Sequence, residues 1–530
     1  MRPHSAGISG LLHRLDERPG HPQRWGALPE FEETTELALQ EKRKLHRSLR
    51  RFDMVFFTVC AFVGLDTLGT VASNGPQGFF WLLLLAVAFV LPYALVMAEV
   101  GSAFTQEGGP YEWTKLAFGR LQAGVAAVLY WVTNPLWVGG SLAFIATQAW
   151  SDHIFRIRSG SAGDYAFKLA FIWLSIMVAI VSLRRGKWIP NAGAFLRVFV
   201  LGFFTVTVIV YAAKHGVHGF PVKDLAPTGA IFLALVPLLL FNYVGFELQN
   251  GAAEEMENPQ RDVPLAIARS AALGVLLYMI PVLGIILVLP SKAVSGIGGF
   301  LDAVTTTFGV YGSASSFLLD LMTLAFVGTL LTSGAVWMIG SDRILAVAAY
   351  DGAFPAFFGR FNDRLGTPVR VNTLSGVVSS IFMIVAVAAF RGGTDSKFVV
   401  VLDIAISTTL ISYLWIFPAA LRLRSTHPAV HRPYRVPGGR AGIATATALI
   451  TFWVALGSWV AVFPGTLEKL FGISYNFRST WGVARATFEW LTLGTLGVIL
   501  LVALVGYALA GDVRRRSAAV PLDMESAHAA

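Results

Sequence analysis

The chain has 530 residues, of which 55% are hydrophobic and only 14% are charged, and its mean hydropathy is +0.63. These values exclude an ordinary water-soluble globular protein and indicate many segments inside a lipid bilayer. The net charge of +9 does not indicate nucleic-acid binding, because the basic residues are spread along the chain and none lies in an RNA- or DNA-binding motif.

Residues 1–51 are polar and contain no hydrophobic region of the kind that a secretory signal has. We therefore expect a cytoplasmic tail, whose basic end from Lys42 to Arg51 lies against lipid headgroups. The single cysteine, Cys60, excludes an intramolecular disulfide. The closely spaced histidines lack acidic or cysteine companions, so we expect neither a metal site nor a cofactor.

Apolar segments long enough to cross a bilayer, about 20 residues each, follow one another along the rest of the chain. They cover residues 53–74, 78–104, 121–150, 166–183, 191–213, 230–253, 265–289, 315–348, 371–390, 398–421, 441–463 and 487–509. The even number of spans puts both termini on one side of the membrane. Most of the 41 Lys and Arg residues lie in the loops of that side, which predicts cytoplasmic termini in the plasma membrane.

The expected fold is an all-α, multi-pass membrane protein with twelve transmembrane helices. We divide it into four parts: a cytoplasmic tail over 1–51, a core of helices one to ten over 52–425, helices eleven and twelve with the preceding basic loop over 426–510, and a second cytoplasmic tail over 511–530.

Two of the predicted spans contain a polar interruption near the middle. The first reads Gly64-Leu65-Asp66-Thr67-Leu68-Gly69, and the sixth reads Asn242-Tyr243-Val244-Gly245-Phe246-Glu247. A charge at the centre of a bilayer costs about 2.5–3.5 kcal/mol on insertion scales, so these acids must face protein or water. Interrupted helices at matching positions are typical of the binding site in transporters built from inverted repeats. Spans one to five and six to ten can therefore be inverted copies, with two helices appended.

Interrupted helices offer free backbone groups, and the positive ends of the half-helices suit a substrate carboxylate. Asp66 and Glu247 are candidates to meet a substrate amine or to carry a proton. The alternative for each is structural: Glu247 could bond to the amides of its own interruption, and Asp66 could cap a helix. The predicted substrate-binding residues are Gly64, Leu65, Asp66, Thr67, Asn242, Tyr243, Gly245, Phe246, Glu247 and Ser333.

Residues 50–425 resemble the amino acid–polyamine–organocation superfamily, most nearly its glutamate/GABA-antiporter-like branch. The resemblance depends on three ordered stretches: Glu107 to Trp113 (EGGPYEW), Tyr243 to Pro264 with its Asn258-Pro259 and Arg261-Asp262 pairs, and Trp337 to Phe357 with Gly340, Arg343 and Pro355. It implies a leucine-transporter-type fold with a 5+5 inverted repeat, alternating access, and a substrate between helices one, three, six, eight and ten. The chain departs from the pattern at GLDTLG in helix one and at Ser333, which stands where the antiporter branch has an acid.

Arg197 in the fifth span lies where the resemblance places a lysine that some proton-coupled members use in place of a sodium ion. Because an arginine does not release its proton in proteins, Arg197 would be a fixed cation there and would leave any proton carrying to Asp66 or Glu247. The alternative is that Arg197 snorkels to the cytoplasmic surface.

Three further residues are predicted to act at gates. Tyr130 and Trp131 in helix three can line or close the cavity, although aromatic residues there more often only pack. Glu255 is a candidate for an ion pair at the cytoplasmic gate.

The sequence thus predicts a secondary transporter that moves amino acids across the plasma membrane by alternating access, independently of sodium and either by exchange or coupled to protons. One alternative is a carrier for another small amine or a nucleobase-like solute, and another is a membrane receptor that binds amino acids without moving them. An enzyme is not expected, because the chain has no clustered His, Asp and Ser partners at one depth. The predicted partners are the amino acid, the lipid bilayer and, if transport is coupled to them, protons, with no nucleic acid, and the sequence indicates no oligomeric state.

Overall fold

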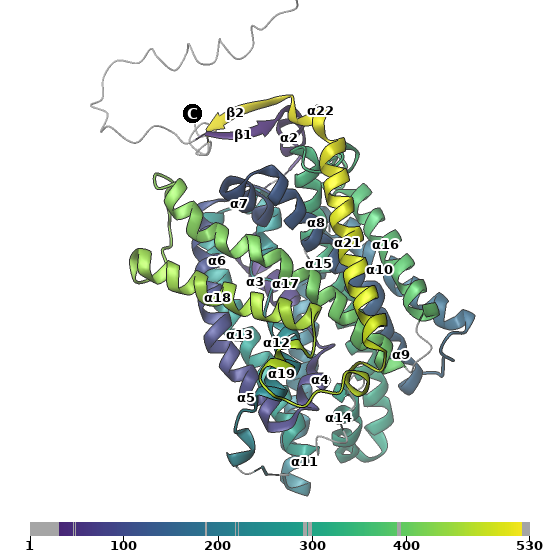
Figure 1. The fold of residues 1–530 in the computed structure, drawn as a ribbon. Helices are drawn as coiled ribbons and strands as arrows, with labels where there is room; N and C mark the ends of the chain where they lie inside the picture. Colours follow the sequence, from purple (N-terminus) through teal and green to yellow (C-terminus); the bar gives the residue numbers. More distant parts are fainter. Residues whose placement is uncertain are drawn as a thin grey trace, which may run out of the picture.

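The computed structural model describes residues 31–45, 47, 49–185, 188–217, 219–220, 222–289, 294, 299–389 and 394–521. Long helices run side by side through most of the molecule (Figure 1). Ten stretches of helix in this described part are long and apolar enough to cross a membrane. They are built from α5 (Gly75–Leu85) with α6 (Leu91–Ala103), α8 (Arg120–Trp137) with α9 (Ala143–His153), α10 (Ala162–Arg185), α11 (Trp188–His215), α13 (Pro259–Val288), α14 (Gly299–Phe308) with α15 (Ser315–Tyr350), α16 (Val369–Ala389), α17 (Thr394–Thr426), α18 (Gly439–Val462) and α21 (Arg485–Leu509).

The two remaining predicted spans are both interrupted helices. The first consists of α3 (Arg51–Phe62) and the short α4 (Leu68–Ala72), with residues 63–67 between them, which we call the first interruption. The sixth consists of α12 (Gly229–Asn242) and the 3-10 helix η4 (Leu248–Glu255), separated by residues 243–247, the second interruption. A multi-pass helical protein is confirmed, whereas the twelve-helix inverted repeat stays a prediction.

The second interruption has a local cause in the sequence. Gly245 has φ of +126°, a conformation that side chains with a Cβ rarely adopt, so glycine is required at this point. The first interruption is shorter than the GLDTLG segment, because Leu68 and Gly69 already belong to α4.

Two long helices keep their course through π-helical turns near a proline. The turn η1 (Ala86–Val90) precedes Pro92, and η2 (Val138–Leu142) follows Pro135. Proline removes one helical hydrogen bond, and a π turn absorbs the change without ending the helix. As a result α8 and α9 form one continuous rod that reaches from one end of the bundle to the other.

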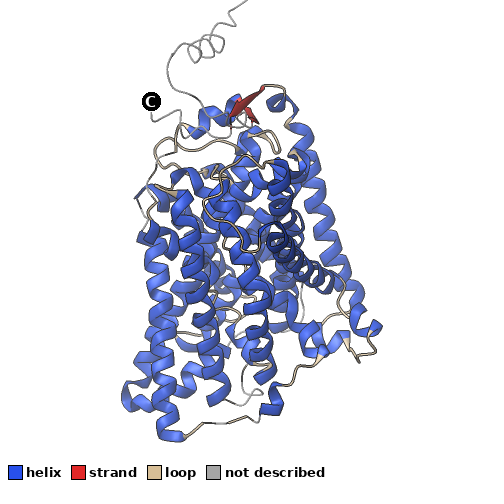
Figure 2. Ribbon diagram, turned by 90° about the vertical axis from the view of Figure 1, so that its left-hand side faces the viewer, coloured by secondary structure: helices blue, strands red, loops and turns tan. Residues whose placement is uncertain are grey.

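Both described chain ends lie at the same end of the bundle, here called the tail end. Strand β1 (Phe31–Thr35) pairs antiparallel with β2 (Ser517–Pro521), in a register that puts Thr35 opposite Ser517. Figure 1 shows this small sheet next to α2 (Glu36–Lys42) and α22 (Gly511–Arg514), with α7 (Gly109–Phe118) below it, and Figure 2 shows the sheet at the same end of the bundle from another side. Neither strand was predicted in the two tails, and residues 1–30 and 522–530 lie outside the described part.

The tail sheet is anchored to the bundle by side chain to backbone hydrogen bonds. The Thr35 hydroxyl donates to the carbonyl of Tyr350 at 2.5 Å, and Arg514 Nη1 donates to the carbonyl of Gly352 at 2.6 Å. The short helices α19 (Thr466–Leu470), α20 (Phe477–Trp481) and η3 (Val222–Leu225) connect long helices elsewhere, and η7 (Ala356–Phe358) follows α15.

Candidate functional site

The second interruption places Glu247 at the centre of the described bundle, fully buried. Its Oε1 accepts hydrogen bonds from the hydroxyls of Tyr130 and Tyr413, each at 2.6 Å, and its Oε2 accepts one from Tyr93. The three tyrosines come from α8, α17 and α6, so three separate helices converge on one carboxylate. All three partners are neutral hydroxyls. Within the described residues, no basic side chain forms an ion pair with Glu247.

The backbone amides freed by this interruption are taken by a tyrosine hydroxyl. Gly245 and Phe246 donate from their N–H groups to the Tyr93 hydroxyl at 3.0 and 3.1 Å. Tyr93 therefore accepts from the interrupted backbone and donates to Glu247. The amides of Gly245 and Phe246 thus bond to Tyr93 and not to Glu247, whereas the alternative of a purely structural role for Glu247 within its own interruption stays open.

The first interruption holds Asp66 in a different environment. Asp66 is 3% exposed, and the indole N–H of Trp137 donates to its Oδ2 at 3.0 Å. The Gly64 N–H donates to the Tyr278 hydroxyl at 2.8 Å. This interruption, too, has one of its free amides occupied by a tyrosine.

Arg197 on α11 reaches into the first interruption and does not snorkel, since its side chain is fully buried. Its Nε donates to the carbonyl of Val63 at 2.9 Å, and its Nη2 donates to the carbonyl of Thr329 at 2.9 Å. Further acceptors are the Gly193 carbonyl at 2.8 Å, the Thr332 hydroxyl at 3.1 Å and the Ser333 hydroxyl. One of these acceptors, the Val63 carbonyl, belongs to unwound backbone, which is the kind of oxygen that coordinates a sodium ion in transporters with interrupted helices. Here a guanidinium is bonded to it.

A series of aromatic rings connects the partners of the two acids, because Trp137 bonds to Asp66 and Tyr130 bonds to Glu247. Trp337 donates its indole N–H to the carbonyl of Ala61 at 2.9 Å. The ring centroid of Trp337 lies 6.3 Å from that of Tyr130 and 6.4 Å from that of Trp137, which in turn lies 5.9 Å from Phe241. Aromatic faces attract an organic cation, so the rings and the Glu247 carboxylate offer the same kind of ligand two complementary contacts.

Glu255 belongs to a second group of charges toward the tail end, the arginine cluster, formed by Glu107, Glu255 and Arg343. Arg343 Nη1 lies 2.8 Å from a carboxylate oxygen of each glutamate. Burial raises the pKa of the Glu107 carboxyl to about 8, against the lowering effect of Arg343. The position is consistent with the predicted gate, although the gating role of Glu255 stays a prediction.

The other predicted residues divide between these groups. Leu65, Thr67, Asn242 and Tyr243 are buried at or beside the interruptions, whereas Ser333 contacts Arg197. Trp131 points away from Glu247 and donates to Asp342 at 3.0 Å. The roles of all these residues as substrate ligands, coupling residues or gates stay predictions.

Sequence reasoning missed Tyr93, Tyr413, Trp137 and Tyr278. A tyrosine or tryptophan in an apolar segment is common, and nothing in its immediate neighbours indicates which acid it will meet. Only the tertiary packing of α6, α8 and α17 brings the three hydroxyls to Glu247.

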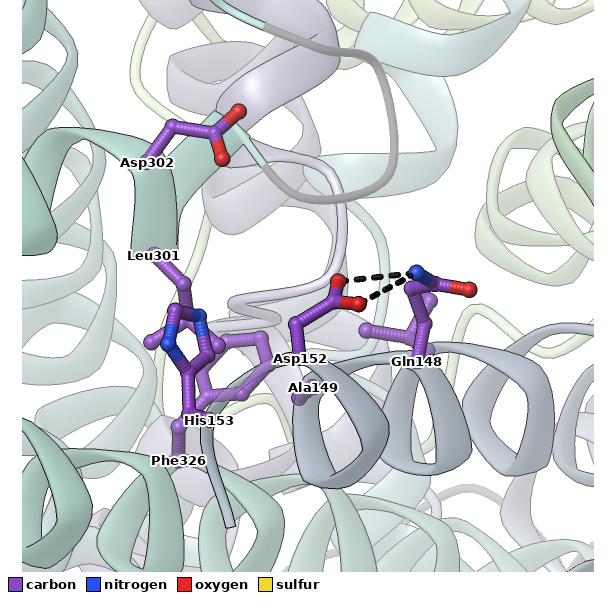
Figure 3. A pocket seen from close by; sticks show the side chains of 8 residues that line it. Gln148, Ala149, Asp152, His153, Leu301, Asp302 and Phe326 are labelled. Atoms are coloured by element: carbon purple, nitrogen blue, oxygen red, sulfur yellow. Dashed lines mark hydrogen bonds between the residues drawn. The ribbon is translucent and has the colours of Figure 1, made fainter. Parts of the chain in front are cut away.

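A shallow pocket also lies between α9 and α14 (Figure 3), lined by Gln148, Ala149, Asp152, His153, Leu301, Asp302 and Phe326 together with Ile145. The Asp152 carboxylate accepts from the Gln148 amide, at 2.8 and 2.9 Å. None of the predicted site residues lines this pocket.

Comparison with known proteins supplies independent evidence. A protein-family model described as amino acid permease matches residues 49–482. A probable agmatine/putrescine antiporter of Lactococcus lactis is 27% identical over 420 residues, which are 79% of this chain and 88% of that protein. An uncharacterized transporter of Legionella pneumophila is 29% identical over 405 residues, 74% of this chain and 84% of the relative. The glutamate/gamma-aminobutyrate antiporter of Lactococcus lactis is 24% identical over 423 residues, 76% and 81% of the two chains.

Proposed function

We propose that this chain, which belongs to the amino acid permease family, exchanges small organic amines across the plasma membrane and does so without sodium. The family and its antiporter relatives indicate a transporter and not an enzyme. The observation that carries the finer proposal is Glu247, a buried carboxylate held by three neutral hydroxyls.

A carboxylate in this position attracts a substrate with a positive charge. A buried charge without a partner is costly, and an ammonium or guanidinium group placed beside it offsets that cost. The neighbouring rings of Trp137, Phe241 and Trp337 favour the same group through cation–π attraction. The relative named as an agmatine/putrescine antiporter supports an amine of this type.

The amides at the interruptions favour an amine over an amino acid. Recognition of a substrate carboxylate at an interrupted helix needs free backbone N–H groups. Those of Gly64, Gly245 and Phe246 already donate to tyrosine hydroxyls. An amino acid, the substrate predicted from the sequence, remains the second candidate, supported by the glutamate/gamma-aminobutyrate relative, and it would have to displace Tyr93 or Tyr278 from these amides.

The buried charge of Glu247 also favours exchange over one-way transport. A carrier that returns empty would cross its intermediate states with the Glu247 charge uncompensated in a low-dielectric interior, whereas a loaded carrier would not. The free-energy barrier for the return of the empty carrier is therefore higher than that for the loaded carrier. This difference favours the exchange of one amine for another.

Sodium independence is supported by Arg197. Its guanidinium occupies the oxygens of Val63 and Thr329 that a sodium ion would need, and an arginine keeps its charge throughout the cycle. Both termini are proposed to be cytoplasmic, in agreement with their common position at the tail end.

The test is uptake of radiolabelled agmatine or putrescine by the purified protein in liposomes that contain unlabelled amine. We expect uptake that requires internal amine and is unchanged when sodium is replaced by choline.

The Glu247→Gln variant keeps the size of the side chain but loses its charge. It should lower exchange more than about 30-fold, since truncating a buried charge pair costs about 2–5 kcal/mol. The proposal is overturned if neither amine is exchanged or accumulated under any imposed gradient. Preferential exchange of amino acids would favour the second candidate, and binding without exchange would favour a receptor.

A further inference from the structure

A second buried carboxylate, that of Asp342 on α15, lies outside the network of Glu247. It is fully buried and accepts three hydrogen bonds from two other helices. Its Oδ1 accepts from the indole N–H of Trp131 at 3.0 Å and from the hydroxyl of Ser375 at 2.6 Å, and its Oδ2 accepts from the side-chain amide of Asn372 at 2.5 Å. Trp131 belongs to α8, and Asn372 and Ser375 belong to α16.

Four described basic side chains on the helices packed around Asp342 have other partners. Arg343, its neighbour on α15, contacts Glu107, Glu255 and the Gly366 carbonyl. Arg370 on α16 lies over the ring of Phe357, and Arg120 on α8 pairs with Asp351. On α10, Lys168 pairs with Asp164. Among the described residues, the partners of the Asp342 carboxylate are therefore neutral donors.

One polar atom at this site has no partner in the described structure. The Oδ1 of Asn372 is buried and unbonded, although the Nδ2 of the same amide donates to Asp342. A half-turn of this amide exchanges the positions of oxygen and nitrogen. In the turned state Oδ1 faces the Asp342 carboxyl and can accept a hydrogen bond from it, which requires a proton on Asp342. Asn372 can thus partner both the charged and the protonated form.

We propose that Asp342 is a proton-binding site of the transport cycle, separate from Glu247. A proton from water adds to a carboxylate oxygen, the side chain changes from one negative charge to neutral, and the new O–H donates to the turned Asn372 amide. Release reverses these steps and restores the three hydrogen bonds seen here. Burial of a charge without a cationic partner is costly, and the bound proton removes that cost.

The position of Asp342 connects the two charge networks of the molecule. Trp131 directly follows Tyr130, which binds Glu247, and Asp342 directly precedes Arg343 of the arginine cluster. A change of charge at Asp342 therefore acts on a residue of α8 that is next in the chain to a ligand of Glu247, and it occurs next in the chain to Arg343. This function in the cycle rests on the proposed amine exchange, whereas proton binding itself does not.

Infrared difference spectra of the full-length protein in lipid, recorded between acidic and alkaline buffers, test proton binding without any substrate. We expect a protonated-carboxyl band that appears in acid and is missing from the Asp342→Asn variant. The matched control is Ser379→Ala, one turn beyond Ser375 on α16 and without a bonded partner for its hydroxyl, which should keep the band. An identical band in Asp342→Asn and wild type overturns the proposal, and so does a wild-type band that sodium abolishes at constant pH, because that would indicate a metal-cation site.

A second variant keeps the test decisive if Asp342→Asn does not fold. Ser375→Ala removes one donor to the charged carboxylate, so the midpoint of the band should move to higher pH by about one unit. An unchanged midpoint contradicts the proposal. In liposomes, the pH dependence of agmatine exchange should shift in the same direction. If the infrared results hold but the wild type exchanges no amine, the proposed function fails while the proton site stands.

Discussion

The two interruptions differ in the side chains that bond to their polar groups. In the first, the chain supplies its own cation, since Arg197 is bonded to the carbonyl of Val63 and to oxygens of α15. In the second, Glu247 is bonded to the hydroxyls of Tyr93, Tyr130 and Tyr413. Two similar breaks, each with one acid, Asp66 or Glu247, thus have different partners: a buried arginine reaches the first, and neutral hydroxyls hold the acid of the second. The comparison shows that a basic side chain of the protein itself reaches the first interruption, whereas the described partners of Glu247 in the second are neutral, which is the basis for proposing that a cationic ligand binds there.

The largest expected effect is on stability, from Arg197→Ala. The substitution leaves several buried oxygens without a donor, so the free energy of unfolding should fall by at least about 3 kcal/mol. Thermal unfolding of the purified protein in detergent measures it, with Arg197→Lys as an intermediate control that keeps the charge.

The same unfolding measurement with and without sodium tests the role of Arg197 more specifically. If Arg197 stands in for a cation, added sodium should raise the melting temperature of Arg197→Ala and leave the wild type unchanged. A melting temperature that does not respond to Arg197→Ala would show that the first interruption does not depend on its built-in cation.

A smaller effect is expected from removing single hydroxyls at the second interruption. Tyr413→Phe and Tyr130→Phe each delete one hydrogen bond of 2.6 Å to Glu247, and a hydrogen bond to a charged group contributes about 1.5–3 kcal/mol. We expect each variant to weaken agmatine exchange about 10-fold or more without unfolding the protein. Initial exchange rates over a range of agmatine concentrations would show it, and wild-type rates in both variants would mean that the tyrosines only pack.

The smallest effect is expected from Asp66→Asn. The amide oxygen can still accept from the Trp137 indole, so packing is kept while the charge is lost. If Asp66 only balances the positive charge of Arg197 nearby and does not bind the substrate, exchange should change by less than about 3-fold, which corresponds to about 0.6 kcal/mol. A loss of exchange as large as that of Glu247→Gln would indicate that the substrate cation binds at Asp66. The first interruption, and not the second, would then hold the substrate.

The sequence was sufficient to locate both interruptions, Asp66, Glu247 and Arg197, because a charged residue or a glycine pair stands out in an apolar segment. It did not reveal the ligands of these charges. Tyr93 and Tyr413 lie on helices 320 positions apart in the chain, and their meeting at Glu247 depends on tertiary packing that no local pattern encodes. Arg197 could be placed in a span, but only the structure distinguishes a bound guanidinium from a snorkelling one.

The ends of the chain and the ends of the helices were harder to predict for related reasons. The segment Phe31–Thr35 is short and polar, and its partner β2 begins at Ser517, so neither strand shows a pattern by itself. Asp342 lies in the motif GSDR near the end of a long apolar span. An acid at such a position is typical of an ordinary helix end, so the sequence did not single it out.

Equilibrium binding of radiolabelled agmatine to the purified protein tests the central claim most directly, with wild type, Glu247→Gln and Asp66→Asn compared in sodium and in choline. The account predicts that Glu247→Gln loses binding, that Asp66→Asn keeps it, and that sodium changes neither. Wild-type affinity in Glu247→Gln, or binding that appears only with sodium, would contradict it.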